Sequence, residues 1–261
     1  MARRRLGQHF LSDPSWRARI LGSLRVNAGD TWLEIGAGHG EITQELASAA
    51  SRVIAVEVDP RLVDELRRLA RRVPNIEVAP GDVLQLDLGG LVGGGRFRVY
   101  GNLPYYITSP ILHRLFNYAD RIDGIHVVIQ LEVAARLVAQ PGRREYGYLS
   151  VLARYYALPE IVLRIPPGAF RPRPKVASAL VHLRLPGQRA SLGITGQARF
   201  LQFVQACFAQ KRKTLLNNLR ALVPADRAGA LLDAAGLGRD ARAEQLALEQ
   251  FAFLFRRLGH D

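Results

Sequence analysis

The sequence predicts an α/β protein in which a doubly wound, mostly parallel sheet is followed by a small all-α C-terminal domain. Two observations carry this prediction. From Thr31 to Leu183, short apolar runs of strand length alternate with runs of helical spacing, and beyond residue 186 only the helical spacing remains. Because alternating strands and helices form a parallel sheet covered by helices, we expect domains of residues 1–186 and 187–261.

The strands expected in this sheet are short, apolar and often rich in Val and Ile. Such runs are typical of strands that are buried on both faces. The expected strands are residues 31–35, 53–59, 76–80, 97–100, 125–130, 161–165 and 177–183.

Capping residues locate two of the helices between these strands. Asp13 followed by Pro14, and Asp59 followed by Pro60, each combine a capping side chain with a proline that the first helical turn tolerates. The glycine-rich piece from Gly89 to Gly95 is expected to be a surface loop. Other helical patterns run through Ala49, Phe116, Leu137 and Tyr156.

The composition favours a polyanionic partner. The formal net charge is +13 and the pI is about 10.7. Only three of the 36 basic residues are lysine, so the charge is almost all guanidinium, which suits forked contacts to phosphates. A codon bias toward Arg at solvated positions explains many of these residues, but it does not explain their excess over 23 acids.

Cysteine content and hydropathy exclude several classes of protein. Cys207 is the only cysteine, which excludes disulfides and thiolate metal sites and indicates a reducing compartment. The basic start lacks the apolar run of a signal peptide, and no stretch approaches the ~18 apolar residues of a membrane span. We therefore expect a soluble, cytoplasmic monomer with no membrane partner and no metal.

One stretch, residues 101–110, organises the candidate site. It follows the strand that ends at Tyr100, so it lies at the carboxyl edge of the sheet, where open α/β folds bind ligands. The Asn102 side-chain oxygen and the Leu103 carbonyl offer two fixed acceptors beside the Tyr105 ring, an arrangement that fits the amino group and plane of adenine. The alternative is a tight turn with a surface tyrosine.

A glycine turn after the first strand indicates a second part of the site. Gly36 and Gly38 follow Glu34, but Glu41 stands where a dinucleotide-binding turn requires its third glycine. An acid such as Glu34 is also unfavourable beside a pyrophosphate. S-adenosylmethionine, which is cationic and has no phosphate, fits this turn better. The alternative is a turn that only packs a helix on a strand.

Carboxylates end the next two strands. Glu57 lies about 20 residues beyond the first glycine, the position from which a carboxylate binds ribose hydroxyls. Asp82 could accept from the amino group of the cofactor's adenine, or it could cap a turn, as Gly-Asp pairs often do.

Two basic segments are candidates for nucleic-acid contact. In residues 170–175 the prolines keep the chain extended, and a period near two would point Arg171, Arg173 and Lys175 the same way. Phe170 could be a second ring facing Tyr105, although core packing is the more usual role of a lone Phe. In the second segment Lys211, Arg212 and Lys213 are expected on a helix, which would spread them around its circumference, so a solvated face is the alternative.

The ordered set of motifs closely resembles the KsgA/RsmA family of ribosomal RNA adenine dimethyltransferases over nearly the whole chain. The resemblance rests on residues 8–11, 34–38, 56–59, 81–82, 102–105, 145–150, 170–176 and 210–215. It implies a Rossmann-like S-adenosylmethionine-dependent methyltransferase sheet. It also implies dimethylation of N6 of two adjacent adenosines in the 3′-terminal hairpin loop of 16S rRNA, in a small-subunit precursor.

Residue roles follow from the same resemblance. The residues implied to line the cofactor and reaction site are His9, Leu11, Gly36, Glu57, Asp82 and Asn102. Two positions depart from the commonest spelling of the family, because His9 and Tyr106 stand where asparagine is frequent.

Three other functions are compatible with parts of the pattern. A DNA adenine-N6 methyltransferase shares Asn-x-Pro-Tyr, but the helical tail is small for a sequence-reading domain. A 23S rRNA methyltransferase of the resistance type differs only in its target RNA. A non-catalytic assembly factor would keep the fold to hold RNA, although an intact Asn102 argues against it.

Overall fold

The computed structural model describes residues 9–104 and 107–259, so the predictions for Tyr105 and Tyr106 lie outside the described residues. The chain forms two compact units. The first consists of the chain up to Ala134 together with Glu160–Leu185, and the second consists of Ala135–Pro159 together with the chain from Pro186. One division lies between Leu185 and Pro186, and residues 135–159 group with the helical unit; domains of residues 1–186 and 187–261 stay a prediction.

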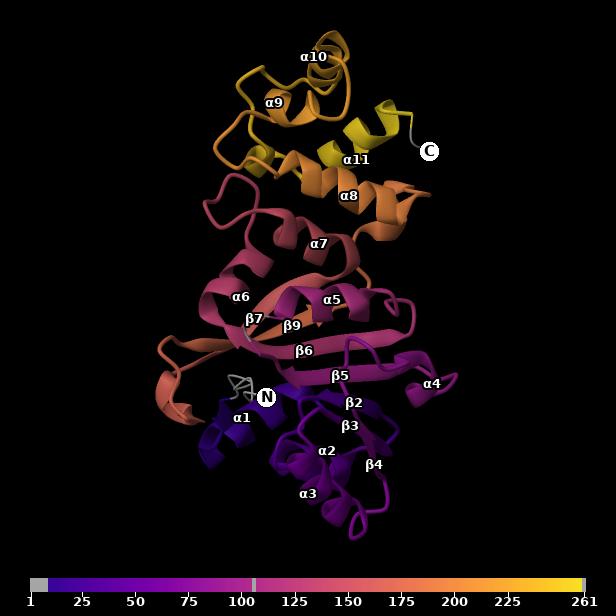
Figure 1. Cartoon of the computed structure of the whole chain (residues 1–261), viewed down its shortest axis with the longest axis vertical. Coiled ribbons are helices and arrows are strands. Elements are labelled where there is room, and N and C mark those ends of the chain that lie inside the picture. The colour runs from indigo at the N-terminus through magenta and orange to yellow at the C-terminus, as the bar shows by residue number, and fades with distance from the viewer. Residues whose placement is uncertain (1–8, 105–106, 260–261) are drawn as a thin grey trace, which may run out of the picture. The chain divides into compact units, whose positions relative to one another are not determined.

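The first unit is built on a seven-stranded sheet in the order β4-β3-β2-β5-β6-β9-β7 (Figure 1). Pairing is parallel from β4 through β6, and β9 runs antiparallel to β6. The strands are β2 (Thr31–Ile35), β3 (Arg52–Glu57), β4 (Ile76–Pro80), β5 (Phe97–Asn102), β6 (Ile122–Gln130), β7 (Leu158–Ile165) and β9 (Ser178–Arg184). The predicted α/β class is confirmed, and each expected strand is present.

The strand order places a topological switch point between β2 and β5. The chain proceeds from β2 outward through β3 and β4, then returns to the other side of β2 and proceeds outward again through β5 and β6. In open α/β sheets the loops at such a point diverge and leave a crevice at the carboxyl ends of the strands. The glycine turn that follows β2 and the Asn102 end of β5 therefore flank the same crevice.

Capping explains where the helices of this unit begin, and it corrects one expectation. The helices are α1 (Pro14–Leu24), α2 (Glu41–Ala49), α3 (Pro60–Ala70), α4 (Leu88–Val92) and α5 (Thr108–Phe116). The division between the units falls inside α6 (Leu131–Val138), and α7 (Tyr148–Tyr156) belongs to the helical unit. Asp13 and Asp59 accept from main-chain amides at the starts of α1 and α3, as predicted. The expected loop at residues 89–95 instead begins inside α4, because Leu88 and Val92, one helical turn apart, are both buried.

The helical unit has an aromatic core. Its remaining helices are α8 (Gln197–Cys207), α9 (Leu215–Leu219), α10 (Ala225–Ala234) and α11 (Leu248–Arg257). Phe200 of α8 meets Phe255 of α11 edge-on at 5.4 Å, and the Tyr146 hydroxyl donates to the Leu246 carbonyl. This bond explains why residues 135–159 belong here: they supply part of the core that α8 and α11 cannot complete alone.

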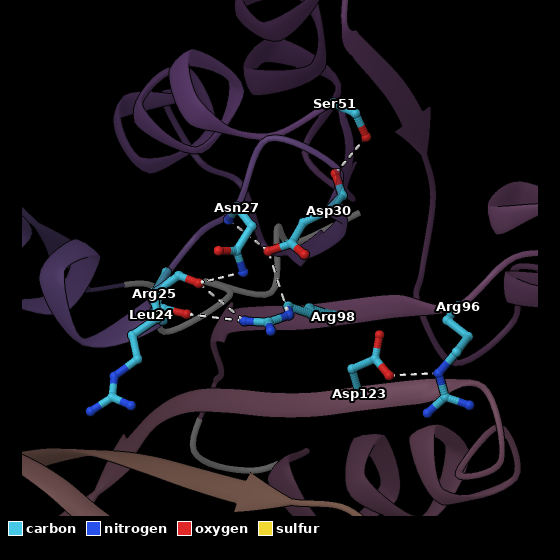
Figure 2. Close-up of polar contacts among 8 residues, drawn as sticks. All are labelled: Leu24, Arg25, Asn27, Asp30, Ser51, Arg96, Arg98 and Asp123. Atoms are coloured by element: carbon cyan, nitrogen blue, oxygen red, sulfur yellow. Dashed lines mark hydrogen bonds and ion pairs between the residues drawn. The ribbon is translucent and has the colours of Figure 1, made fainter.

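Arg98 anchors α1 at the end of the sheet opposite Asn102. Figure 2 shows its guanidinium between Asp30 and the last carbonyls of α1, with bonds to the Leu24 and Arg25 oxygens of 3.4 and 3.2 Å. Arg25 ends α1 in the left-handed backbone conformation, with a φ angle of 50°, which residues other than glycine rarely adopt. Arg98 therefore donates to carbonyls at the end of α1 that have no partner within the helix.

Candidate active site

The glycine turn and the end of β5 approach each other closely at the switch point. Gly36 and Gly38 adopt positive φ angles of 74° and 59°, a conformation that favours glycine. A side chain at Gly101 would lie 2.7 Å from Leu103 and 3.2 Å from the Ile35 carbonyl. Glycine is therefore required on both sides of the crevice, and at Gly36, which is exposed, the main chain itself faces the solvent.

Glu57 is held rigidly at the end of β3. Its carboxylate accepts from three main-chain amides, those of Gly38 at 3.0 Å, Val58 at 2.8 Å and Asp59 at 2.9 Å. Its side chain is buried, and the bond to Gly38 ties the glycine turn to the neighbouring strand. A carboxylate fixed in this way has a single orientation at the edge where ribose hydroxyls were predicted to bind; the binding itself stays a prediction.

Asp82 caps a turn, which was the alternative to its predicted contact with the cofactor. Its Oδ1 atom accepts from the Leu84 amide at 2.9 Å, which closes a turn after β4. Asp82 is half-buried just after the end of β4. Contact with the cofactor's adenine remains a prediction.

Glu34 is not a charged neighbour of the glycine turn. It lies on β2, it is only 2% exposed, and burial raises its pKa to about 8. The group is therefore mostly protonated at neutral pH. The argument that a negative charge on Glu34 excludes a pyrophosphate is therefore wrong. The acid that remains near the turn is the exposed Glu41, in the first turn of α2.

Asn102 ends β5, and its amide is oriented by the main chain. Its Nδ2 atom donates to the His9 carbonyl at 2.8 Å. Because a carbonyl can only accept, the amide nitrogen must face His9 and Oδ1 must face away from it. Asn102 lies at the strand end rather than in a loop, and acceptance by its Oδ1 from a target base stays a prediction.

A two-stranded sheet brings distant residues to this asparagine. β1 (Phe10–Leu11) pairs antiparallel with β8 (Phe170–Arg171). Next to this pairing, Nδ1 of His9 lies 2.6 Å from the Pro172 carbonyl. Sequence reasoning missed this link, because two strands of two residues separated by about 160 positions leave no periodic signal.

Leu11 and Phe170 pack in the core of the first unit. They are 8% and 1% exposed and share one apolar cluster with Tyr100. The structure thus gives Phe170 the core packing that was its alternative, and the buried ring offers no free face to a base. Leu103 is also buried, and its amide donates to the Val128 carbonyl on β6, which fixes the main chain on the amino side of Pro104.

Phe10 is a site residue that the sequence did not single out. Its ring lies 4.8 Å from the His39 ring and 3.2 Å from the place that a Cβ on Gly38 would occupy. Only glycine at position 38 allows this approach. Phe10 at the start of β1 therefore lies against the glycine turn, while His9, the residue before β1, contacts Asn102.

A family model described as ribosomal RNA adenine dimethylase matches residues 1–259. The chain belongs to this family. The resemblance stated from the motifs is thereby confirmed, and so is the prediction that the protein is a methyltransferase.

Individual relatives of this adenine dimethylase align over nearly its whole length. The ribosomal RNA small subunit methyltransferase A of Acidobacterium capsulatum is 44% identical and covers 97% of this chain and 90% of that protein. The protein of the same name from Koribacter versatilis is 40% identical, with 97% and 93% covered.

Two solved structures share the fold of the adenine dimethylase. The 23S rRNA methyltransferase ErmE aligns with a TM-score of 0.73 at 32% identity, covering 96% of this chain and 100% of that one. A dimethyladenosine transferase from Plasmodium falciparum aligns with a TM-score of 0.82 at 24% identity, covering 96% and 98%. The Rossmann-like methyltransferase sheet expected from the resemblance is confirmed.

The basic residues predicted to bind RNA are all exposed in the adenine dimethylase. Arg171, Arg173 and Lys175 lie at the end of β8 and just after it in the first unit. Residues 211–213 lie in the turns between α8 and α9, so our placement of them on a helix is wrong, and with it the argument that they must spread around a helix axis. Lys211 donates to the Arg144 carbonyl at 3.0 Å within the helical unit.

Membrane spans and metal clusters are both absent from the part of the chain that the structure describes. No helix there combines the length and apolar character needed to cross a membrane. Nor do three or more His, Cys, Asp or Glu side chains gather, within residues 9–104 and 107–259, in a way that could hold a metal ion.

Proposed function

We propose that this protein uses S-adenosylmethionine to dimethylate N6 of two adjacent adenosines in the 3′-terminal hairpin loop of 16S rRNA, during small-subunit biogenesis. The observation that carries the proposal is the fixed Asn102 amide, whose Oδ1 faces away from His9 at the switch point. The identity of 44% and 40% to small-subunit methyltransferases, against 32% to ErmE, favours 16S rRNA over 23S rRNA.

The residues present fit the proposed cofactor. Gly36 is exposed and has no side chain, so the main chain of the turn can approach a bound molecule. The rigid Glu57 carboxylate suits ribose hydroxyls, while Gly36, Gly38, Asp82 and Leu11 would complete the binding edge. Bound there, S-adenosylmethionine supplies a methyl group made electrophilic by its sulfonium.

The chain's own contribution is to hold the target nitrogen. The N6 lone pair of adenine is delocalised into the ring, which makes it a poor nucleophile. Asn102 Oδ1 and the Leu103 carbonyl would accept from the two N6 hydrogens and favour a tetrahedral nitrogen with its lone pair directed at the methyl carbon. The cationic product then releases a proton to water. Tyr105 would stack the displaced base, a contact worth about 1–3 kcal/mol per base.

The second methylation constrains the pocket. After the first transfer only one N6 hydrogen remains, so one of the two acceptors no longer has a donor and the new methyl group takes that place. The polar pair that orients adenine must therefore leave enough room for a methyl group at one of its two positions.

The proposed function has a direct test. Undermethylated small subunits incubated with the protein and methyl-labelled S-adenosylmethionine should yield N6,N6-dimethyladenosine in 16S rRNA. Naked duplex DNA and large subunits, tested in parallel, should take up far less label. Label confined to 23S rRNA would reassign the target, and no label in any RNA while the cofactor binds would favour the non-catalytic assembly factor.

The helical unit is proposed to contribute RNA contacts through residues 211–213. The double variant Arg212→Gln, Lys213→Gln should weaken binding to the ribosomal substrate and make it less salt-dependent. The slope of log Kobs against log salt should become shallower by about 0.7 for each phosphate that the variant no longer neutralises. Lys211 is left intact because its bond to Arg144 holds the neighbouring segment.

A matched control for this pair exists in the same unit. Arg239 is also exposed but is ion-paired with Asp233 at 2.9 Å, so Arg239→Gln removes a guanidinium that is already neutralised. The proposal predicts a smaller change in slope for the control. Equal slopes for the double variant and the native protein would show that residues 212 and 213 do not contact RNA phosphates.

A further inference from the structure

His9 makes two contacts that point in different directions. Its main-chain carbonyl accepts from Nδ2 of Asn102 at 2.8 Å, and Nδ1 of its ring lies 2.6 Å from the carbonyl of Pro172. The three residues come from three places in the sequence, namely the position just before β1, the end of β5 and the connection that follows β8. One residue therefore joins the candidate catalytic asparagine to the basic segment 171–175.

The chemistry of the ring contact fixes a proton. The Pro172 carbonyl can only accept, so Nδ1 of His9 must carry the hydrogen. A neutral His9 is thus held as the Nδ1–H tautomer, and a protonated His9 could make the same bond. In both states the bond gives the ring one orientation. A fixed ring restricts the main chain of the same residue, including its carbonyl.

The contact contributes more to geometry than to stability. The bond between His9 and Pro172 is exposed to solvent, and an exposed hydrogen bond adds little net free energy to folding because water can replace it. The bond to Asn102 is partly buried, and it decides which end of the amide faces the crevice. A rotated amide would present donors to N6, which is itself a donor, so even partial loss of this orientation removes the acceptor.

We infer that His9 is a positioning residue, whose ring is anchored on the Pro172 carbonyl so that its own carbonyl orients the Asn102 amide. The inference rests on the proposed function. It differs from the role implied by the family resemblance, in which His9 contacts the cofactor. The two roles predict effects on different quantities. Loss of a cofactor ligand weakens the affinity for S-adenosylmethionine, whereas loss of a positioning residue lowers turnover.

The consequence for the reaction is a connection between substrate binding and catalysis. Arg171 pairs with Phe10 in the β1–β8 ladder, and Arg173 and Lys175 follow closely after Pro172. Phosphates bound by these cations would steady the segment that carries the Pro172 carbonyl. The same event would then steady the amide that accepts from the target base.

Three proteins, the native one and two variants, separate these roles. His9→Phe keeps a planar ring but has no N–H, whereas His9→Asn places its Nδ2 near the position of the lost Nδ1. We expect turnover at saturating cofactor and RNA to fall at least about 10-fold in His9→Phe and to recover to within about threefold in His9→Asn. The dissociation constant for S-adenosylmethionine, measured by calorimetry, should change less than about threefold in both.

A double-mutant cycle tests whether His9 acts through Asn102. In an Asn102→Ala background there is no amide to orient, so adding His9→Phe should cause no further loss of turnover. A further loss of full size would overturn the inference. So would a His9→Phe protein with native turnover, or one whose only defect is weaker cofactor binding.

A measurement on the native protein makes the test independent of folding and of activity. Nitrogen-15 NMR of the imidazole distinguishes the two neutral tautomers, and we expect the Nδ1–H form for the neutral His9 ring. The Nε2–H form would overturn the inference even if every variant misfolded. If the native protein failed to methylate RNA, the proposed function would fall, while the tautomer would still report whether the Pro172 contact exists.

Discussion

Asn102→Ala is expected to lower the rate of methyl transfer by about two to three orders of magnitude, the usual cost of removing a group that stabilises charge developing in a transition state. The truncated residue has no Oδ1 to accept from N6, so the nitrogen keeps its planar, delocalised form. Binding of S-adenosylmethionine should persist, because the glycine turn and the Glu57 carboxylate are held by contacts that do not involve the Asn102 side chain. Single-turnover transfer of labelled methyl to undermethylated subunits, together with calorimetry of the cofactor, measures both quantities.

Two further variants make the Asn102 result specific. Asn117→Ala, at the end of α5, changes the same residue type at a distance from the crevice and should leave the rate near native. Asn102→Asp keeps the size of the side chain but turns its donor into an acceptor facing the His9 carbonyl, so it should also be slow. A native rate in Asn102→Ala would remove the residue from the mechanism.

The sequence predicts this architecture well where local chemistry decides the outcome. Asp13 and Asp59 cap helices as their spacing to proline predicts, and the seven strands of the large sheet appear where apolar runs stand between polar turns. These features depend on residues that are neighbours in the chain. The switch point follows from them as well, because the order of strands and helices constrains the topology.

Features set by tertiary contact were not predictable from the sequence. The β1–β8 pair and the contact of His9 with Pro172 join residues about 160 positions apart through very few bonds. The protonation of Glu34 depends on burial, and the sequence cannot show how much water reaches a residue next to a glycine turn. Residues 135–159 look like a continuation of the first domain until their core partners in the helical unit are known.

The second large effect concerns the pH dependence of stability, which two buried groups in the first unit should control in opposite directions. On β6, His126 is 4% exposed and stacks on His182 of β9 with ring centroids 4.1 Å apart. Burial, with smaller contributions from His182 and from Arg98 on β5, lowers the pKa of His126 to about 3. On β2, burial raises the pKa of Glu34 to about 8.

The sign of each effect follows from which state binds more protons. Between its folded pKa of about 3 and its usual value of 6.5, His126 is protonated only in the unfolded chain, so its contribution to stability is lost as the pH falls through this range. Between its usual value of 4.5 and about 8, Glu34 is protonated only in the folded protein, so its contribution is lost as the pH rises. Each slope is about 1.4 kcal/mol per pH unit at most.

Single variants should separate two effects that nearly cancel in the native protein between pH 4.5 and 6.5. His126→Phe keeps a ring against His182 and removes the His126 slope, so between pH 4.5 and 6.5 its free energy of unfolding should decrease with rising pH relative to that of the native protein. In Glu34→Gln the free energy of unfolding should instead increase as the pH rises from 4.5 to 6.5, relative to that of the native protein. Urea unfolding followed by circular dichroism at a series of pH values measures these slopes, and all other titrating groups are common to the three proteins. If the variants and the native protein gave parallel curves, neither group would be buried in the protonation state that the fold assigns to it.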